Sequence, residues 1–209
     1  MEIVQTAEGR RVFLLGVVRG LESERAVVRE ALGESSADAI ALSISDEEMK
    51  ALELYEKGEV PPSNFEEDVY IDGLSRFGEV KKPPPCFVEA RDLARKGGLK
   101  CHALDMNDQD YTEAYVSNVG TFEMMRHSMN EARLRRWRSK ADTPEDFVIE
   151  FDGKVNDAKG FRRLEKARER HMAGRLVELL NDHERVLAVV EVERAKGVGQ
   201  VLRSTCPGI

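Results

Sequence analysis

A single arginine occupies the most suggestive position in this sequence, at the end of a buried apolar stretch. Arg19 follows the apolar residues 12–18, in a turn bounded by Gly16 and Gly20. A helix-forming segment comes next. In an open α/β sheet, ligands bind at the carboxyl ends of the strands and next to a helix N-terminus. A guanidinium group there suits a phosphate or a carboxylate, because its fork of donors matches both.

Polar and charged residues follow the other apolar stretches as well. Ser43 lies near the end of the second, Asp105 ends the third, and Glu193 and Arg194 follow the last. The carboxyl ends of parallel strands meet at one edge, so Arg19 and Arg194 are expected to face each other. Two like charges in one place require an anion between them. In the alternative arrangement, Glu193 lies between the arginines as an internal counter-charge.

Each residue also has a purely structural interpretation. An arginine in a surface turn, such as Arg19, commonly forms a salt bridge with a nearby acid. Arg194 lies within three residues of Glu191 and Glu193. Asp105 is placed to cap the helix that follows it. These interpretations stay open beside the ligand-binding one.

The elements that must position these residues alternate between strands and helices. The expected strands are residues 2–6, 11–18, 38–44, 99–105 and 185–192. Consecutive apolar positions are typical of strands covered on both faces. The pattern predicts an α/β fold, with a parallel-dominated open sheet of four to five strands and helices on both faces. We expect a single domain over 1–209, with a helical insertion over 108–181 before the last core strand.

Local signals set several boundaries. Ser45 and Glu48 have the spacing of a capping box, which predicts a helix start. Thr143 followed by Pro144 predicts another. Asp152–Gly153 is typical of a turn. Within the insertion, the inward-facing residues are expected to be Tyr111, Tyr115, Phe122, Met125 and Met129.

Composition narrows the class of protein. The 209 residues are 34% charged, with a net charge of −7 and no apolar run long enough to cross a membrane. The N-terminus lacks the basic start and apolar core of a signal peptide, so a cytoplasmic location is expected. An acidic protein is repelled by phosphate, which argues against nucleic acid as the main partner. The basic run 133–140, which contains Trp137, keeps an interaction with protein or nucleic acid open as an alternative.

Motifs for cofactors and metals are missing. The four histidines have no metal-ligand spacing, and no phosphate-binding loop, Gly-x-Gly-x-x-Gly or His-Glu-x-x-His is present. We therefore expect neither a bound metal nor a cofactor.

Several stretches together resemble one known family in their order along the chain. They are residues 12–16, 37–42, 103–105, 169–173, and 186–190 with 196–198. The chain resembles the TraB/PrgY family, which belongs with the Tiki-type metalloprotease-like proteins. The resemblance implies the α/β fold and a site at the strand ends, and it places Asp105 and Arg170 in family-like positions.

The sequence departs from the family at its signature. The family has Gly-x-x-His after the first strand and again after the last, whereas residues 16–19 and 191–194 both end in arginine. Ser43 stands where a glutamate is expected. A guanidinium has no acceptor and is not a metal ligand, so these changes argue against metalloprotease chemistry. They favour a binding or regulatory module for an anionic small ligand. The predicted ligand-binding residues are Gly16, Arg19, Gly20, Ser43, Asp105, Arg170, Glu193 and Arg194.

A different enzyme is the main alternative. Asp105, Asp108, Glu191 and Glu193 are candidates to hold Mg²⁺ or Mn²⁺ while the arginines clamp a phosphoryl group. The sequence assigns no catalytic residue beyond this. The helical insertion also offers a surface for a homodimer.

Overall fold

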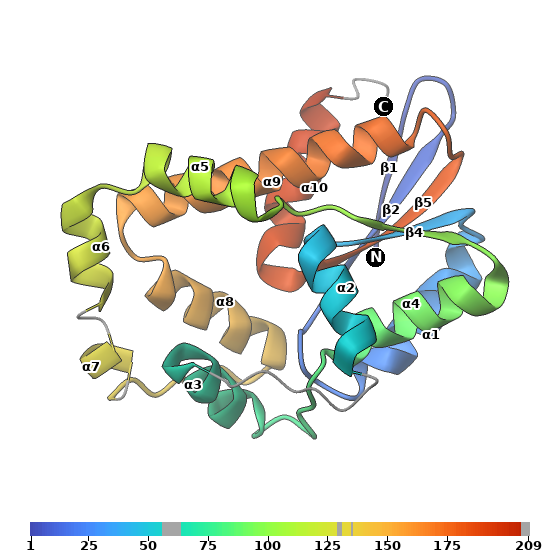
Figure 1. Cartoon of the computed structure of the whole chain (residues 1–209). Coiled ribbons are helices and arrows are strands. Elements are labelled where there is room, and N and C mark those ends of the chain that lie inside the picture. Colours follow the sequence, from blue (N-terminus) through green and yellow to red (C-terminus); the bar gives the residue numbers. More distant parts are fainter. Residues whose placement is uncertain (56–63, 129–130, 135, 206–209) are drawn as a thin grey trace.

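One five-stranded sheet forms the centre of the protein. The computed structural model describes residues 1–55, 64–128, 131–134 and 136–205. The strands are β1 (Glu2–Gln5), β2 (Arg11–Val17), β3 (Ala39–Leu42), β4 (Lys100–Ala103) and β5 (Arg185–Glu191). Their order is β1-β2-β5-β3-β4, and β1 alone is antiparallel to its neighbour (Figure 1). The predicted α/β fold with a parallel-dominated sheet is confirmed.

Helices make up most of the remaining structure. They are α1 (Glu24–Ser35), α2 (Asp46–Tyr55), α3 (Phe65–Leu74), α4 (Pro85–Gly97), α5 (Asp108–Asn118), α6 (Thr121–Ser128), α7 (Glu131–Leu134), α8 (Pro144–Val155), α9 (Lys159–Leu179) and α10 (Val192–Thr205). Among the described helices, none combines the length and the apolarity needed to cross a membrane.

Both faces of the sheet are covered, as expected. On one face, side chains such as Leu15 and Ile40 pack against α1 and α4. On the other, Leu14 and Val190 pack against α9 and α10. The central strands β3 and β5 are buried almost throughout, which explains why their sequences are apolar at consecutive positions.

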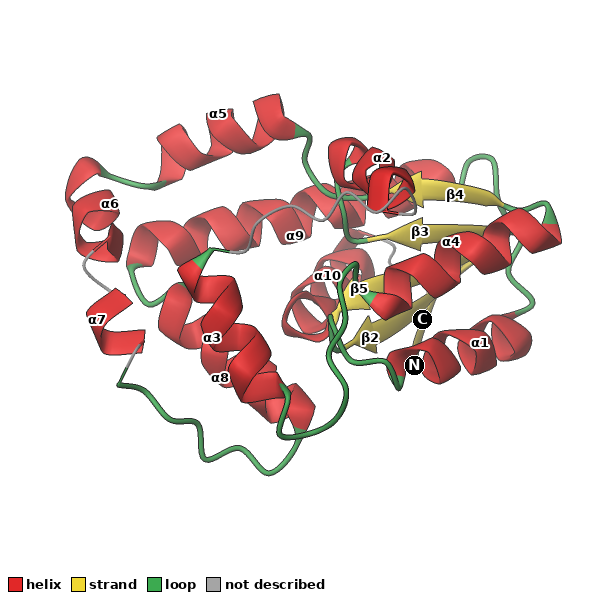
Figure 2. Ribbon diagram, turned by 60° about the horizontal axis from the view of Figure 1, so that its bottom comes forward, coloured by secondary structure: helices red, strands yellow, loops and turns green. Residues whose placement is uncertain are grey.

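The helices α3 and α5 to α8 lie beyond the carboxyl ends of the parallel strands (Figure 2). Helix α9 connects this group to the sheet. Its C-terminal half buries Met172 and Leu176 against the strands, while its N-terminal half buries Phe161 and Leu164 beside α5. The expected insertion over 108–181 therefore contributes part of the main core.

Local signals in the sequence correctly located several boundaries. The Ser45 amide donates to Glu48 Oε2 at 2.9 Å, and the Glu48 amide donates to Ser45 Oγ at 3.2 Å, which completes the capping box. Thr143 Oγ1 accepts from the Asp146 amide at 3.1 Å and caps α8. The hairpin of β1 and β2 is also present.

Two local predictions were wrong. Asp152 and Gly153 lie inside α8 and form no turn. Three of the residues expected to face inward in the insertion are exposed, by 38% at Tyr111, 78% at Phe122 and 60% at Met125. The core of this region is built instead around Phe161 and its neighbours, which Tyr115 contacts. Met129 lies outside the described residues.

The packing of α3 against α8 yields a test. Gly73 of α3 lies against the ring of Phe147, which is 1% exposed, and an added Cβ would collide with that ring. We expect Gly73→Ala to lower the free energy of unfolding by about 1–3 kcal/mol, because a buried ring must move.

Gly33→Ala is the matched control in urea unfolding. Gly33 of α1 has open space around its Cα, so alanine there should stabilise the protein by up to about 1 kcal/mol through helix propensity. Equal stability of the two variants would contradict the close contact between α3 and α8.

Candidate functional site

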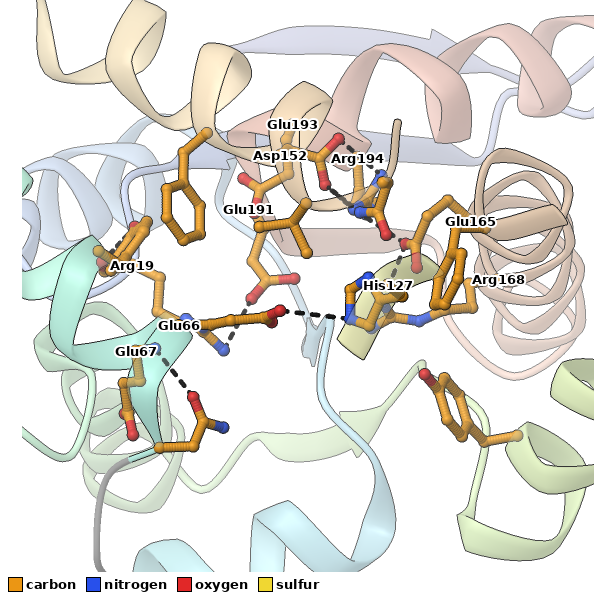
Figure 3. Close-up of a pocket in the computed structure, with 17 residues that line it drawn as sticks. Arg19, Glu66, Glu67, His127, Asp152, Glu165, Arg168, Glu191, Glu193 and Arg194 are labelled. Atoms are coloured by element: carbon orange, nitrogen blue, oxygen red, sulfur yellow. Dashed lines mark hydrogen bonds and ion pairs between the residues drawn. The ribbon is translucent and has the colours of Figure 1, made fainter. Parts of the chain in front are cut away.

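A cavity of about 450 Å³ opens at the carboxyl edge of the sheet. The ends of β2 and β5 form its floor, and the helices α3, α5, α6, α8 and α9 surround it (Figure 3). It is lined by Arg19, Asn64, Glu66, Glu67, Tyr70, Tyr111, His127, Phe151, Asp152, Val155, Asn156, Phe161, Glu165, Arg168, Glu191, Glu193 and Arg194. The predicted location of the site coincides with this cavity.

Arg194 is the most buried charge in the cavity, with 7% of its side chain exposed. Helix α10 begins directly after β5, so Arg194 belongs to its first turn. Its guanidinium lies 2.9 Å from Glu165 of α9 and contacts Asp152 of α8. Three helices therefore meet at one ion cluster (Figure 3).

Arg168 extends this cluster toward β4. Its guanidinium donates to Asp105, which follows β4, and to Glu165 at 3.0 Å. Asp105 therefore has an ion-pair partner as well as its predicted place near the site. Arg170, in contrast, is exposed on α9 and does not line the cavity, so the structure does not bring it together with Arg19 and Arg194.

Arg19 lies on the opposite wall. Its Nη1 is 3.4 Å from Glu191 Oε1, and its guanidinium lies over the ring of Tyr70, 5.8 Å from the centroid. The Tyr70 hydroxyl donates to the Arg19 carbonyl at 2.7 Å. The Ser43 hydroxyl accepts from the Glu191 amide at 3.1 Å, so Ser43 supports the site without lining it.

The two predicted glycines shape the backbone beside the cavity. Gly16 allows α10 to lie close to β2, since an added Cβ would be 3.4 Å from Ala195 Cβ. Gly20 has φ of +108°, a conformation that favours glycine. It borders a second cavity of about 290 Å³, next to the first. Both residues act through the backbone and neither lines the main cavity.

Glu193 differs from the other acids of the cavity. Its Oε2 atom is buried and has no hydrogen-bond partner. Burial raises the pKa of Glu193 to about 8, and the nearby Glu191 contributes to the rise. Its carboxyl group is therefore mostly protonated at neutral pH.

The lining carries more negative than positive groups. Six carboxyl groups, of which Glu193 keeps its proton at neutral pH, line the cavity with three guanidiniums, and all three guanidiniums form ion pairs. Burial also raises the pKa of Glu165, although Arg168 and Arg194 oppose the shift. The predicted pair Arg19 and Arg194 is present in one cavity, but its counter-charges are Glu191, Asp152 and Glu165.

Sequence reasoning missed three charged residues of this site. They are Asp152, which was assigned to a turn, and Glu165 and Arg168 of α9. Their partners are up to 63 residues away along the chain. No local sequence pattern predicts such pairs, because each of these residues is also common on the exposed face of a surface helix.

The magnesium or manganese cluster of the alternative enzyme does not assemble among the described residues. Asp105 is paired with Arg168, and Asp108 is exposed at the start of α5. Within the described part of the chain, no group of three or more His, Cys, Asp or Glu side chains has an arrangement able to hold a metal ion.

The aromatic residue of the basic run is engaged in the core. Trp137 stacks on Phe147 with ring centroids 6.0 Å apart and also contacts Phe151. The ring is thus not free to stack on bases in this conformation. Arg135 lies outside the described residues.

Comparison with known proteins adds no family to the description of the fold and the site. No protein-family model matches it, and no curated protein matches it either. What is shown is an α/β protein with a charged cavity at the carboxyl edge of a mixed sheet. The resemblance to the TraB/PrgY family stays a prediction.

Removing the buried guanidinium tests the ion cluster. Arg194→Met should lower the free energy of unfolding by about 3 kcal/mol, because it leaves the partly buried Asp152 and Glu165 without a counter-charge. Arg175→Met is the control, since Arg175 pairs with Glu178 on an exposed part of α9 and should cost less than about 1 kcal/mol. Similar losses in urea unfolding would contradict the special role of Arg194.

The pKa of Glu193 predicts how stability depends on pH. Between about pH 4.5 and pH 8, folded Glu193 keeps a proton that the unfolded chain releases, so its contribution to stability falls as pH rises. Glu193→Gln removes the ionisable group and with it this loss of stability at higher pH. The variant should therefore gain stability relative to the original protein as pH rises from 5 to 9.

Urea unfolding at pH 5, 7 and 9 measures this effect. Glu30→Gln, on the exposed side of α1, should differ from the original protein by a constant amount. A constant difference for Glu193→Gln as well would show that Glu193 ionises normally in the folded protein.

Proposed function

We propose that this protein binds a small polar molecule carrying a positively charged group, in the cavity at the carboxyl edge of the sheet. The observation that carries the proposal is the buried Oε2 atom of Glu193, which has no hydrogen-bond partner among arginines that already have partners. A buried acid without a donor is costly, and a cationic donor on a ligand would remove that cost.

The remaining lining supports the same ligand chemistry. The excess of carboxylates over guanidiniums attracts a cation into the cavity. Phe151 adds an aromatic surface, and ring faces attract cations, as the guanidiniums of Arg19 over Tyr70 and of Arg168 over Tyr111 already show. The volume of about 450 Å³ is in the range of small-molecule sites.

The anionic ligand predicted from the sequence is less well supported by these contacts. An anion at Arg19 or Arg194 would have to compete with Glu191, or with Asp152 and Glu165. Arg19 is the more accessible of the two, with 44% of its side chain exposed. The two ligand classes make opposite predictions in one experiment.

The resemblance to the TraB/PrgY family belongs to this proposal. The stretches that carry it fall on β2, β3, the end of β4, α9, β5 and α10, and none of their residues lines the cavity itself. A binding or regulatory role is consistent with arginines in place of the family's histidines. A cytoplasmic location and a homodimer accompany the proposal as expectations from the sequence.

Thermal unfolding and calorimetry with charged probes test the proposal. Choline and methylguanidinium stay cationic from pH 6 to pH 9, and phosphate and succinate are the anionic probes. We expect the cations to raise the melting temperature and to bind more tightly as pH rises through 8, because ionisation of Glu193 adds a negative charge to the cavity.

Two variants assign the effect to the cavity. Glu193→Gln should weaken cation binding about tenfold or more, a loss of about 1.4 kcal/mol. Glu30→Gln, on the exposed side of α1, should leave it unchanged. Stabilisation by the anions alone, lost in Arg19→Met, would replace the cationic ligand with the anionic one.

A further inference from the structure

Two histidines face each other at the far edge of the sheet. His102 lies on the edge strand β4, and His183 lies in the turn between α9 and β5. Their Nε2 atoms are 3.3 Å apart, and the side chain of His183 is only 10% exposed. Neither residue lines the cavity described above.

A carboxylate held by backbone amides lies beside one of the two rings. Asp38 Oδ1 lies 3.4 Å from His183 Nδ1. Asp38 is itself held by backbone amides, because its Oδ2 accepts from Glu184 at 3.0 Å and from Arg185 at 3.3 Å. If the neutral ring of His183 carries its proton on Nδ1, on the side of Asp38, then Nε2, on the side of His102, has the free lone pair. This carboxylate–histidine arrangement is the one that metal-ligating histidines use.

We propose that His102 and His183 form a transition-metal site, with Asp38 as the positioning residue. Two nitrogens bonded to one tetrahedral Zn²⁺ at about 2.0–2.1 Å are about 3.3–3.4 Å apart. The observed separation of the two Nε2 atoms is therefore already that of two ligands on one ion.

The site supplies two protein ligands, and water completes the coordination. Imidazole selects Cu²⁺, Ni²⁺ or Zn²⁺ over the oxygen-preferring Mg²⁺ and Ca²⁺. Lys100, Arg175 and Asp182 lie near His102, and Asp38 lies beside His183. A bound ion would tie the edge strand β4 to the end of α9. Sequence spacing gave no hint of this site, because its ligands are 81 residues apart.

Metal titration of the full chain tests the site. After treatment with a chelator and its removal, we expect Zn²⁺ to bind in calorimetry with one ion per chain and to raise the melting temperature. His102→Gln and His183→Gln should each weaken binding at least tenfold, and Asp38→Asn by about tenfold. His171→Gln, elsewhere on α9, should leave it unchanged.

Electron paramagnetic resonance of bound Cu²⁺ gives a readout that does not depend on how well the variants fold. The original protein should show hyperfine coupling to two imidazole nitrogens. Coupling to fewer than two nitrogens, absence of Zn²⁺ binding, or equal Zn²⁺ affinity in His102→Gln would each overturn the proposal. The outcome is independent of the cation-binding cavity, whose residues are unchanged in these variants.

Discussion

A buried guanidinium needs carboxylates beside it, and Arg194 is buried. This requirement constrains where the helices beyond the sheet can lie. Glu165 of α9 and Asp152 of α8 provide these carboxylates. Glu165 is shared with Arg168, which in turn holds Asp105 after β4. Charges of alternating sign thus run from α8 to the edge of the sheet. The hydrophobic contacts bring the helices to the sheet, and this series of ion pairs determines how they meet it.

The same constraint explains the behaviour of Glu193. The carboxylates closest to the three arginines already neutralise them, so Glu193 finds no counter-charge of its own. A buried acid in that position lowers its energy by keeping its proton, which is why its pKa rises. The cavity therefore contains a group, the Glu193 carboxyl, whose charge depends on the ligand that binds. Such a group makes ligand binding and proton release parts of a single equilibrium.

The sequence was most informative where a signal is local. Consecutive apolar residues indicated β3 and β5 because both strands are covered on each face. Ser45 and Glu48 marked the start of α2 because their hydrogen bonds form within one turn. The Asp152–Gly153 signal failed because the packing of α8 outweighs the weak helix propensity of one glycine.

The site was predictable in position but not in charge. Helix geometry turns the chain by about 100° per residue, so Arg170 points away from the cavity that Arg168 enters. A prediction that names the right helix can thus choose an arginine that does not line the cavity. The net charge of the site could not be predicted either, because it depends on carboxylates that other helices and strands bring to the arginines. An arginine without a partner suggests a site for an anion. Here the arginines are already paired with buried acids, so the group that a ligand would have to satisfy is Glu193, whose Oε2 has no partner.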